Sequence, residues 1–124
     1  MQSNSASGNA GILFKDSSGT QNGVIYYDFD DDYLKFSTNA DTERVRITSD
    51  GNVGISSTAP KTDVDISQKT GAVALPQGTT AQRPSGSAPY IRKNSTNNAL
   101  EFYNGTNWVE IITDYFPTGS TTLG

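Results

Sequence analysis

Apolar and polar residues alternate along much of this chain, in short runs of about four to six residues. The pairs Leu34/Phe36 and Leu100/Phe102 show a two-residue period, and Val45/Ile47 and Val53/Ile55 repeat it. This is the period of side chains along a β-strand, and no longer segment has a helical period. The pattern predicts an all-β chain with strands over residues 11–15, 23–28, 33–38, 43–48, 52–55, 64–66, 72–75, 90–93, 99–103 and 108–112.

The alternation also predicts which side chains are covered. Apolar positions are expected to face a core, and their polar neighbours are expected to face solvent. The predicted solvent-facing residues are Lys35, Arg44, Arg46 and Glu101. In the C-terminal part of the chain, the predicted core consists of Leu100, Phe102 and Trp108, with Tyr103 at its rim.

Turn signals separate the predicted strands. Asp50-Gly51 and Asn104-Gly105 are dipeptides that favour positive φ at the corner of a hairpin. Residues 56–61 and 76–88 are rich in Ser, Thr, Pro and Gln, and they are predicted to connect strands outside the sheets.

The two halves of the chain resemble each other. Residues 33–39 are followed by an alternating strand at 44–48, and residues 99–104 by one at 108–111; each half contains an L-x-F strand, which a tyrosine-bearing strand precedes. This echo predicts two small β-meander modules. The predicted division is an N-terminal polar arm (1–10), a first β module (11–55), a linker (56–70), a second β module (71–112) and a C-terminal tail (113–124).

The composition favours burial shared between copies of the chain. Only 33% of the 124 residues are hydrophobic, which is little for a monomer that covers its own core. Yet 10% are aromatic and the apolar residues are clustered, which argues against disorder. A small meander has one face to bury and little to bury it against. The sequence therefore predicts that the modules need partners.

Several kinds of chemistry are disfavoured. The net charge is −4 and no basic stripe is present, so nucleic-acid binding is not expected. The chain has no cysteine or histidine, which removes disulfides, thiolate ligands and the commonest general base. No apolar run has the length of a membrane-spanning helix or a signal-peptide core, so membrane insertion is not expected. We predict no enzymatic activity and no cofactor.

An acidic cluster at residues 28–32 partly matches a calcium-binding loop. Its carboxylates occupy positions 1, 3 and 5 of the EF-hand pattern. However, Tyr33 stands where that loop needs Gly, and Asn39 stands where it needs Glu. A solvated hairpin turn without metal is the favoured interpretation. Asp30 and Asp32 are also poor candidates for glycosidase chemistry, because a tight turn offers no concave apolar setting.

Aromatic residues gather near the second predicted hairpin. Tyr90, Tyr103 and Trp108 are candidate glycan contacts, because aromatic faces stack on sugar rings. The alternative is that Trp108 belongs to the module core with Phe102, and the sequence favours this alternative.

The segment 71–111 reads GAVALPQGTTAQRPSGSAPYIRKNSTNNALEFYNGTNWVEI. It resembles a module of tail-fibre and other virion structural proteins of bacteriophages, especially marine ones, whose pattern is roughly ALPxGTTAQRP…IRYN…FExYxGTxW. The block 11–55, which ends in LKFSTNADTERVRITSDGNVGI, is similar to a repeated shaft block of the same proteins. The two blocks together cover most of the chain.

The resemblance implies a structural protein on the exterior of a virion, with intertwined β modules in a homotrimeric fibre. The expected partners are other copies of the chain and other virion proteins. The alternatives are a glycan-binding receptor-recognition module of a fibre tip, which would serve host attachment, and a capsid-surface decoration or subunit of another extracellular filament. A depolymerase or a self-cleaving chaperone is the least favoured class, because the resemblance carries no catalytic residues across.

Overall fold

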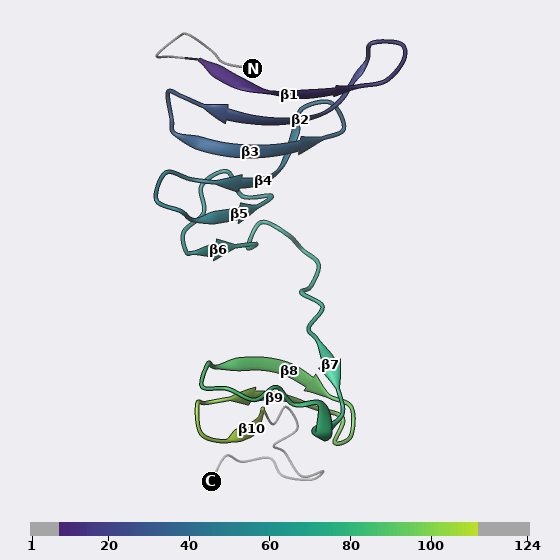
Figure 1. Ribbon diagram of the computed structural model, residues 1–124, viewed down its shortest axis with the longest axis vertical. Helices are drawn as coiled ribbons and strands as arrows, with labels where there is room; N and C mark the ends of the chain where they lie inside the picture. The colour runs from purple at the N-terminus through teal and green to yellow at the C-terminus, as the bar shows by residue number, and fades with distance from the viewer. Residues whose placement is uncertain (1–7, 112–124) are drawn as a thin grey trace, which may run out of the picture. The chain divides into compact units, whose positions relative to one another are not determined.

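The computed structural model describes residues 8–111, which form two compact units with a boundary between Ala72 and Val73 (Figure 1). Each unit contains one β-sheet, and the helical content of the described residues is a three-residue 3-10 turn, η1 (Thr80–Gln82). The predicted all-β fold of small meanders is confirmed. The predicted arm falls largely, and the predicted tail wholly, outside the described residues, as does Ile112, the last residue of the predicted strand 108–112.

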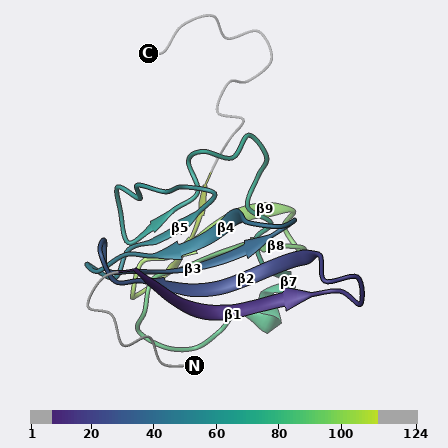
Figure 2. The same ribbon diagram turned by 90° about the horizontal axis from the view of Figure 1, so that it is seen from above.

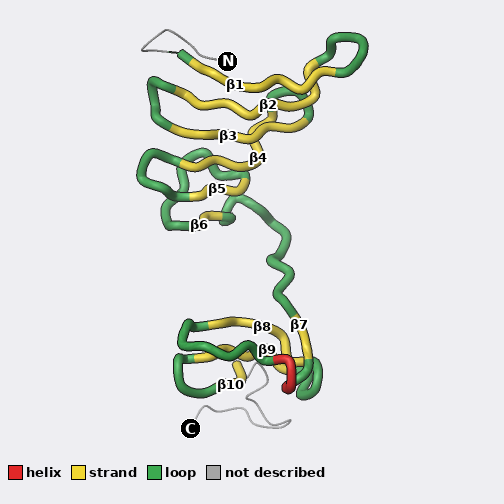
Figure 3. Tube along the Cα trace, viewed as in Figure 1, coloured by secondary structure: helices red, strands yellow, loops and turns green. Residues whose placement is uncertain are grey.

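The first unit is a six-stranded sheet in which every strand pairs with the next one along the chain (Figures 1 and 3). Figure 2 shows strands β1 to β4 running side by side. All neighbours are antiparallel except β5 and β6, which are parallel. The strands are β1 (Asn9–Lys15), β2 (Gln21–Asp28), β3 (Tyr33–Thr38), β4 (Thr42–Ile47), β5 (Val53–Ile55) and β6 (Val64–Asp65).

The second unit is a four-stranded sheet of order β10-β9-β8-β7. Strands β8, β9 and β10 form an antiparallel meander, and β7 adds a short parallel edge beside β8. The connection from β7 to β8 contains η1. The strands are β7 (Gln77–Gly78), β8 (Tyr90–Asn94), β9 (Ala99–Tyr103) and β10 (Trp108–Ile111).

One predicted strand is wrong. Residues 72–75 are apolar but pair with no strand, whereas β7 lies two residues further on, inside the predicted connection 76–88. Strand β7 exists because Gln77 pairs with Lys93 and Gly78 pairs with Asn94. Gln77 and Gly78 carry no apolar side chain, so the alternation of apolar and polar residues does not indicate this strand. Strand β6 lies within the predicted linker and belongs to the first sheet. The two predicted turn glycines, Gly51 and Gly105, have φ of 85° and 96°.

The first sheet has one face that is apolar across all six strands. Strand register places Ile12 opposite Ile25, Ile25 opposite Phe36, and Phe36 opposite Val45, so these side chains share a face. We call this the open apolar face, because its side chains are half-exposed or exposed, up to 59% for Ile12 and 62% for Val64. Its members are Ile12, Phe14, Ile25, Tyr27, Leu34, Phe36, Val45, Ile47, Val53, Ile55 and Val64.

The second sheet repeats this arrangement. Ile91, Phe102 and Val109 oppose one another on adjacent strands, and so do Leu100 and Ile111. These five residues form the open apolar face of the second sheet, and all of them are half-exposed or exposed. In residues 8–111, Val24 is the one hydrophobic residue that counts as buried. The apolar faces are therefore not the cores of the isolated units.

Candidate interaction surfaces

The polar face of the first sheet is more buried than its apolar face. Lys35 was predicted to face solvent, but only 7% of its surface is exposed, and Ser37 beside it is also buried. That prediction is wrong for Lys35, and Arg46 is half-buried rather than exposed. Arg44 is also half-buried, and its Nε donates to Thr38 Oγ1 at 2.8 Å.

Tyrosine rings hold these cations on the polar face. The Lys35 ammonium lies 4.2 Å from the centre of the Tyr26 ring, and the Arg46 guanidinium lies 3.7 Å from that of Tyr33. The two tyrosine hydroxyls are 3.1 Å apart and share a hydrogen bond. Arg46 also makes two hydrogen bonds of 2.8 Å to Glu43. Cations over aromatic faces allow the sheet to cover charged side chains without a second layer.

The charges on this face are balanced by neighbours. Burial by itself would lower the pKa of Lys35, but its ion pair with Asp41 at 3.0 Å and its contact with Tyr26 raise that pKa above the usual value. The hydrogen bond to Tyr26, followed by burial, raises the pKa of Tyr33. Lys35 therefore stays protonated and Tyr33 stays neutral at ordinary pH.

Asp65 fixes the end of the first sheet. Its carboxylate accepts hydrogen bonds from the backbone N–H groups of Ser67 and Lys61, both at 2.9 Å, and lies 3.4 Å from Ser57 Oγ. The Ser67 contacts, followed by the Lys61 N–H, lower the pKa of Asp65 to about 2. The carboxylate thus ties the β5–β6 connection to the sheet. In this connection the Ser57 carbonyl oxygen lies close to Gly54, and a Cβ added to Gly54 would be 2.1 Å from that oxygen.

The second unit buries a carboxylate at its centre. Glu101 was predicted to face solvent, yet its exposure is 0%. Arg83 donates from Nη2 to Glu101 Oε2 at 2.6 Å, and Asn94 donates to the same oxygen at 3.0 Å. The Arg83 hydrogen bonds keep the pKa of Glu101 below its usual range despite burial. The prediction fails because the segment 76–88 covers the polar face, not the apolar one.

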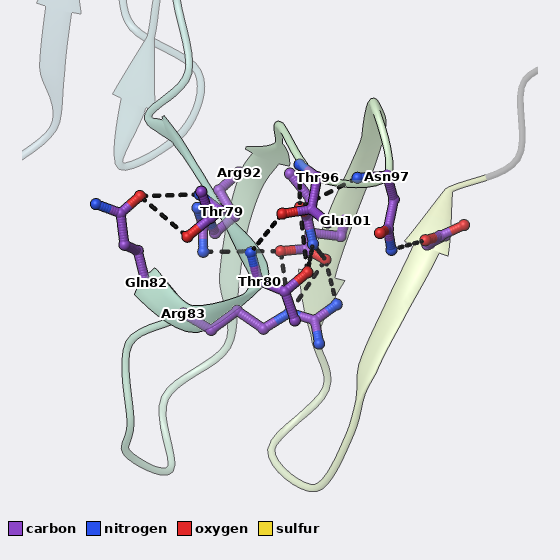
Figure 4. A network of polar contacts seen from close by, with 10 residues as sticks. Thr79, Thr80, Gln82, Arg83, Arg92, Thr96, Asn97 and Glu101 are labelled. Carbon is purple, nitrogen blue, oxygen red and sulfur yellow. Dashed lines mark hydrogen bonds and ion pairs between the residues drawn. The ribbon is translucent and has the colours of Figure 1, made fainter.

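The covering segment is itself held by side-chain hydrogen bonds. The Gln82 carbonyl oxygen accepts from the Thr79 N–H at 2.9 Å, which closes η1. Thr80 accepts at its hydroxyl from Asn94 Nδ2 at 3.0 Å and donates its N–H to Thr96 Oγ1 at 3.1 Å. These bonds attach the segment to β8 and to the turn that follows it, so that Arg83 is positioned above Glu101 (Figure 4).

The three candidate glycan residues lie together on the same face as Glu101. The ring centres of Tyr103 and Trp108 are 5.4 Å apart, and Tyr90 stacks at 6.1 Å from Tyr103 and 6.3 Å from Trp108. The Arg83 guanidinium is 5.3 Å from the Trp108 ring. All three aromatic residues are half-buried.

The predicted core of the second module is therefore wrong. Trp108 pairs with Tyr103, whereas Phe102 pairs with Val109, so Trp108 and Phe102 lie on opposite faces of the sheet. Leu100 and Phe102 are half-exposed on the open apolar face. Adjacent residues in a strand point to opposite faces, and the sequence pattern did not show which face the loop covers.

The acidic turn between β2 and β3 is closed by its own first residue. Asp28 Oδ1 accepts hydrogen bonds from the N–H groups of Asp30 and Asp31, both at 3.0 Å. These bonds, that of Asp31 foremost, keep the pKa of Asp28 below its usual value. Within the described residues no three His, Cys, Asp or Glu side chains are grouped as metal ligands would be.

Arg83 and Arg92 are the residues that reasoning from sequence missed. Arg92 lies directly opposite Glu101 on the neighbouring strand, and Arg83 lies 18 positions before Glu101 in a segment without periodicity. A cross-strand Arg–Glu pair is a recognisable signal once the register of β8 and β9 is known. The contribution of Arg83 has no such signal.

Comparison with protein families, curated proteins and solved structures found no match. In the part of the chain that the structure describes, no helix has the length and apolar character needed to cross a bilayer.

Proposed function

We propose that this chain is a structural subunit of a virion, which assembles as a homotrimer into a fibre or fibre-like appendage on the outside of a phage particle. The open apolar faces are the observation that supports this proposal. A continuous apolar surface over six strands is unusual for a protein that remains a monomer. Burying one large apolar side chain contributes about 1.5–3 kcal/mol, so covering several of them would favour association strongly.

Other copies of the same chain are the favoured covering partner. Two apolar sheet faces pack against each other about 10 Å apart and can bury both surfaces at once. Each unit carries such a face, and the faces of the two sheets have the same register pattern. The copy number of three and the virion location rest on the resemblance of residues 11–55 and 71–111 to phage fibre modules.

Two adjacent residues of β1 provide a matched test of assembly. Phe14 lies on the open apolar face and is 51% exposed, whereas Leu13 points to the other face and is 50% exposed. We expect sedimentation velocity and native mass spectrometry to find a trimer or a larger assembly for the wild type. Phe14→Asp should weaken that assembly, and Leu13→Asp should retain it. A well-folded wild-type monomer at micromolar concentration, or equal behaviour of the two variants, would contradict the proposal.

The virion location needs a separate observation. Cryo-electron microscopy of the native particle should place the chain in an external appendage. A fibre tip would favour receptor recognition, and a shaft would favour a purely structural role. Density on the capsid surface would support the decoration alternative, and a filament without a particle would support a subunit of another extracellular fibre.

Binding of a bacterial surface glycan is the second candidate function. The aromatic group of Tyr90, Tyr103 and Trp108 favours it, because stacked rings beside arginines are suited to sugar recognition. Tyr103→Ala should then reduce adsorption to host cells while the assembly and its melting temperature stay close to wild type. A variant that loses assembly before it loses adsorption would assign the aromatic group to structure alone.

A further inference from the structure

The second unit contains a cavity of about 330 Å³ beside the aromatic group. Pro76, Gly78, Gln82, Pro84, Tyr90 and Arg92 contribute to its lining. Ligand sites in proteins commonly occupy about 300–1,000 Å³, so this cavity matches a small ligand of one or two rings. Its wall combines apolar proline and tyrosine surface with a few polar groups, as binding sites usually do.

Arg92 brings a guanidinium with an unused hydrogen-bond donor to this cavity. Its exposure is 5%, and its Nη1 has no hydrogen-bond acceptor among residues 8–111. Glu101 Oε1 is 3.8 Å from Nη1, which is close enough for an ion pair but too far for a hydrogen bond. Glu101 is already bonded to Arg83 and Asn94. A buried guanidinium with unused donors is costly unless an acceptor meets it.

Two neighbours of Arg92 complete the arrangement. The Gln82 carbonyl oxygen is used by Thr79, whereas its amide nitrogen makes no hydrogen bond within the described part of the chain. A Cβ at Gly78 would lie 2.6 Å from Arg92 Nη2 and 2.9 Å from Gln82 Oε1. The glycine thus leaves room for both polar side chains at the cavity, where Arg92 Nη2 and the Gln82 amide nitrogen make no hydrogen bond within residues 8–111.

We propose that this cavity binds the carboxylate of an acidic sugar, a hexuronic acid residue. The inference rests on the second candidate function, glycan binding, and it adds the class of glycan and the residues that select it. A planar guanidinium matches a carboxylate in geometry as well as charge. The Gln82 amide adds a neutral donor, and Pro84 and Tyr90 offer apolar surface to the sugar ring.

The test is titration of the full-length protein with D-glucuronate, D-glucose and inorganic phosphate, followed by calorimetry and NMR. We expect saturable binding of glucuronate, with glucose and phosphate at least about tenfold weaker. Loss of hydrogen bonds to a charged group changes affinity by about 10- to 100-fold, so Arg92→Gln should weaken glucuronate binding to that extent. Arg44→Gln, in the first unit, removes the same charge and should leave binding unchanged.

Gln82→Glu provides a second variant if Arg92→Gln does not fold. The new carboxylate can still accept from Thr79, but it replaces the amide donor with a charge that repels the ligand. The inference is overturned if the wild type does not bind glucuronate saturably, if phosphate binds as well as glucuronate, or if folded variants at both positions bind it normally. If glucose binds as well as glucuronate, glycan binding stands and selection of an acidic sugar does not.

Discussion

The two sheets bury their polar faces in different ways. In the first sheet, cations of β3 and β4 lie over tyrosines of β2 and β3, so the sheet covers its own charges. In the second, a separate segment lies over the polar face and delivers Arg83 to Glu101. In the first arrangement Asp41, the counter-charge of Lys35, stays exposed to water, and the second arrangement removes a carboxylate from water entirely. Stability of the second unit should therefore depend much more on a single charge.

The sharpest test of this difference is Glu101→Gln. The substitution leaves Arg92 and the partly buried Arg83 without a counter-charge, and removing one partner of a buried ion pair costs about 3–5 kcal/mol. Urea unfolding followed by tryptophan fluorescence measures this effect in the second unit, because Trp108 is the only tryptophan in the chain.

Glu110→Gln is the matched control for that experiment. Glu110 is exposed and lies on β10 opposite Glu101, where it accepts a hydrogen bond from Asn97 at 2.7 Å. An exposed polar contact of this kind is worth at most about 1 kcal/mol. Equal losses for the two variants would mean that Glu101 is not the centre of the second unit.

Acid should weaken both units through different carboxylates. Asp65 and Glu101 have pKa values below those of the unfolded chain, at about 2 for Asp65. Because each carboxylate binds its proton more weakly when folded, its contribution is fully present above its unfolded pKa, roughly 4, and is lost as the pH falls through the folded pKa, about 2 for Asp65. The melting temperature should decline over this range, and Asp65→Asn should flatten the decline in circular dichroism without changing the acid response of Trp108 fluorescence.

The smallest expected effect is that of metal removal. Asp28 closes its turn with bonds of 3.0 Å from two N–H groups, and Asn104 closes the turn before β10 in the same way, at 2.9 and 2.8 Å. Since a neutral amide performs this task in the second unit, the carboxylates of the first need no cation to hold the turn. Melting temperatures in EDTA and in calcium should agree. A shift of more than a few degrees would indicate a shared site, for instance one formed by Asp30 or Asp32 from three chains.

Reasoning from sequence located most strands, but it assigned burial to the apolar face of each sheet, whereas the polar face is the more buried one. The periods of Leu34/Phe36 and Leu100/Phe102 identified β3 and β9 with the bounds that the structure has. Period-two alternation shows which residues share a face, but it does not show which face another segment covers. Lys35 and Glu101 were misplaced for this reason.

The candidate site was only partly visible in the sequence. The aromatic residues were found because Tyr90, Tyr103 and Trp108 recur at strand positions. The cavity depends on Gln82 and Pro84, which belong to the segment that covers the sheet, and on the parallel pairing of β7 with β8. A two-residue strand without apolar residues leaves no periodic trace.

The buried Glu101 also makes strand β9 intolerant of misalignment. A shift of β9 by one residue would carry Glu101 to the open apolar face and place Leu100 or Phe102 beneath Arg83 and Arg92. Both arginines would then lack an anion, and a carboxylate would interrupt the surface proposed for assembly. The same charge pair that holds one unit together thus specifies a single pairing of its strands, and with it a single arrangement of the open apolar face.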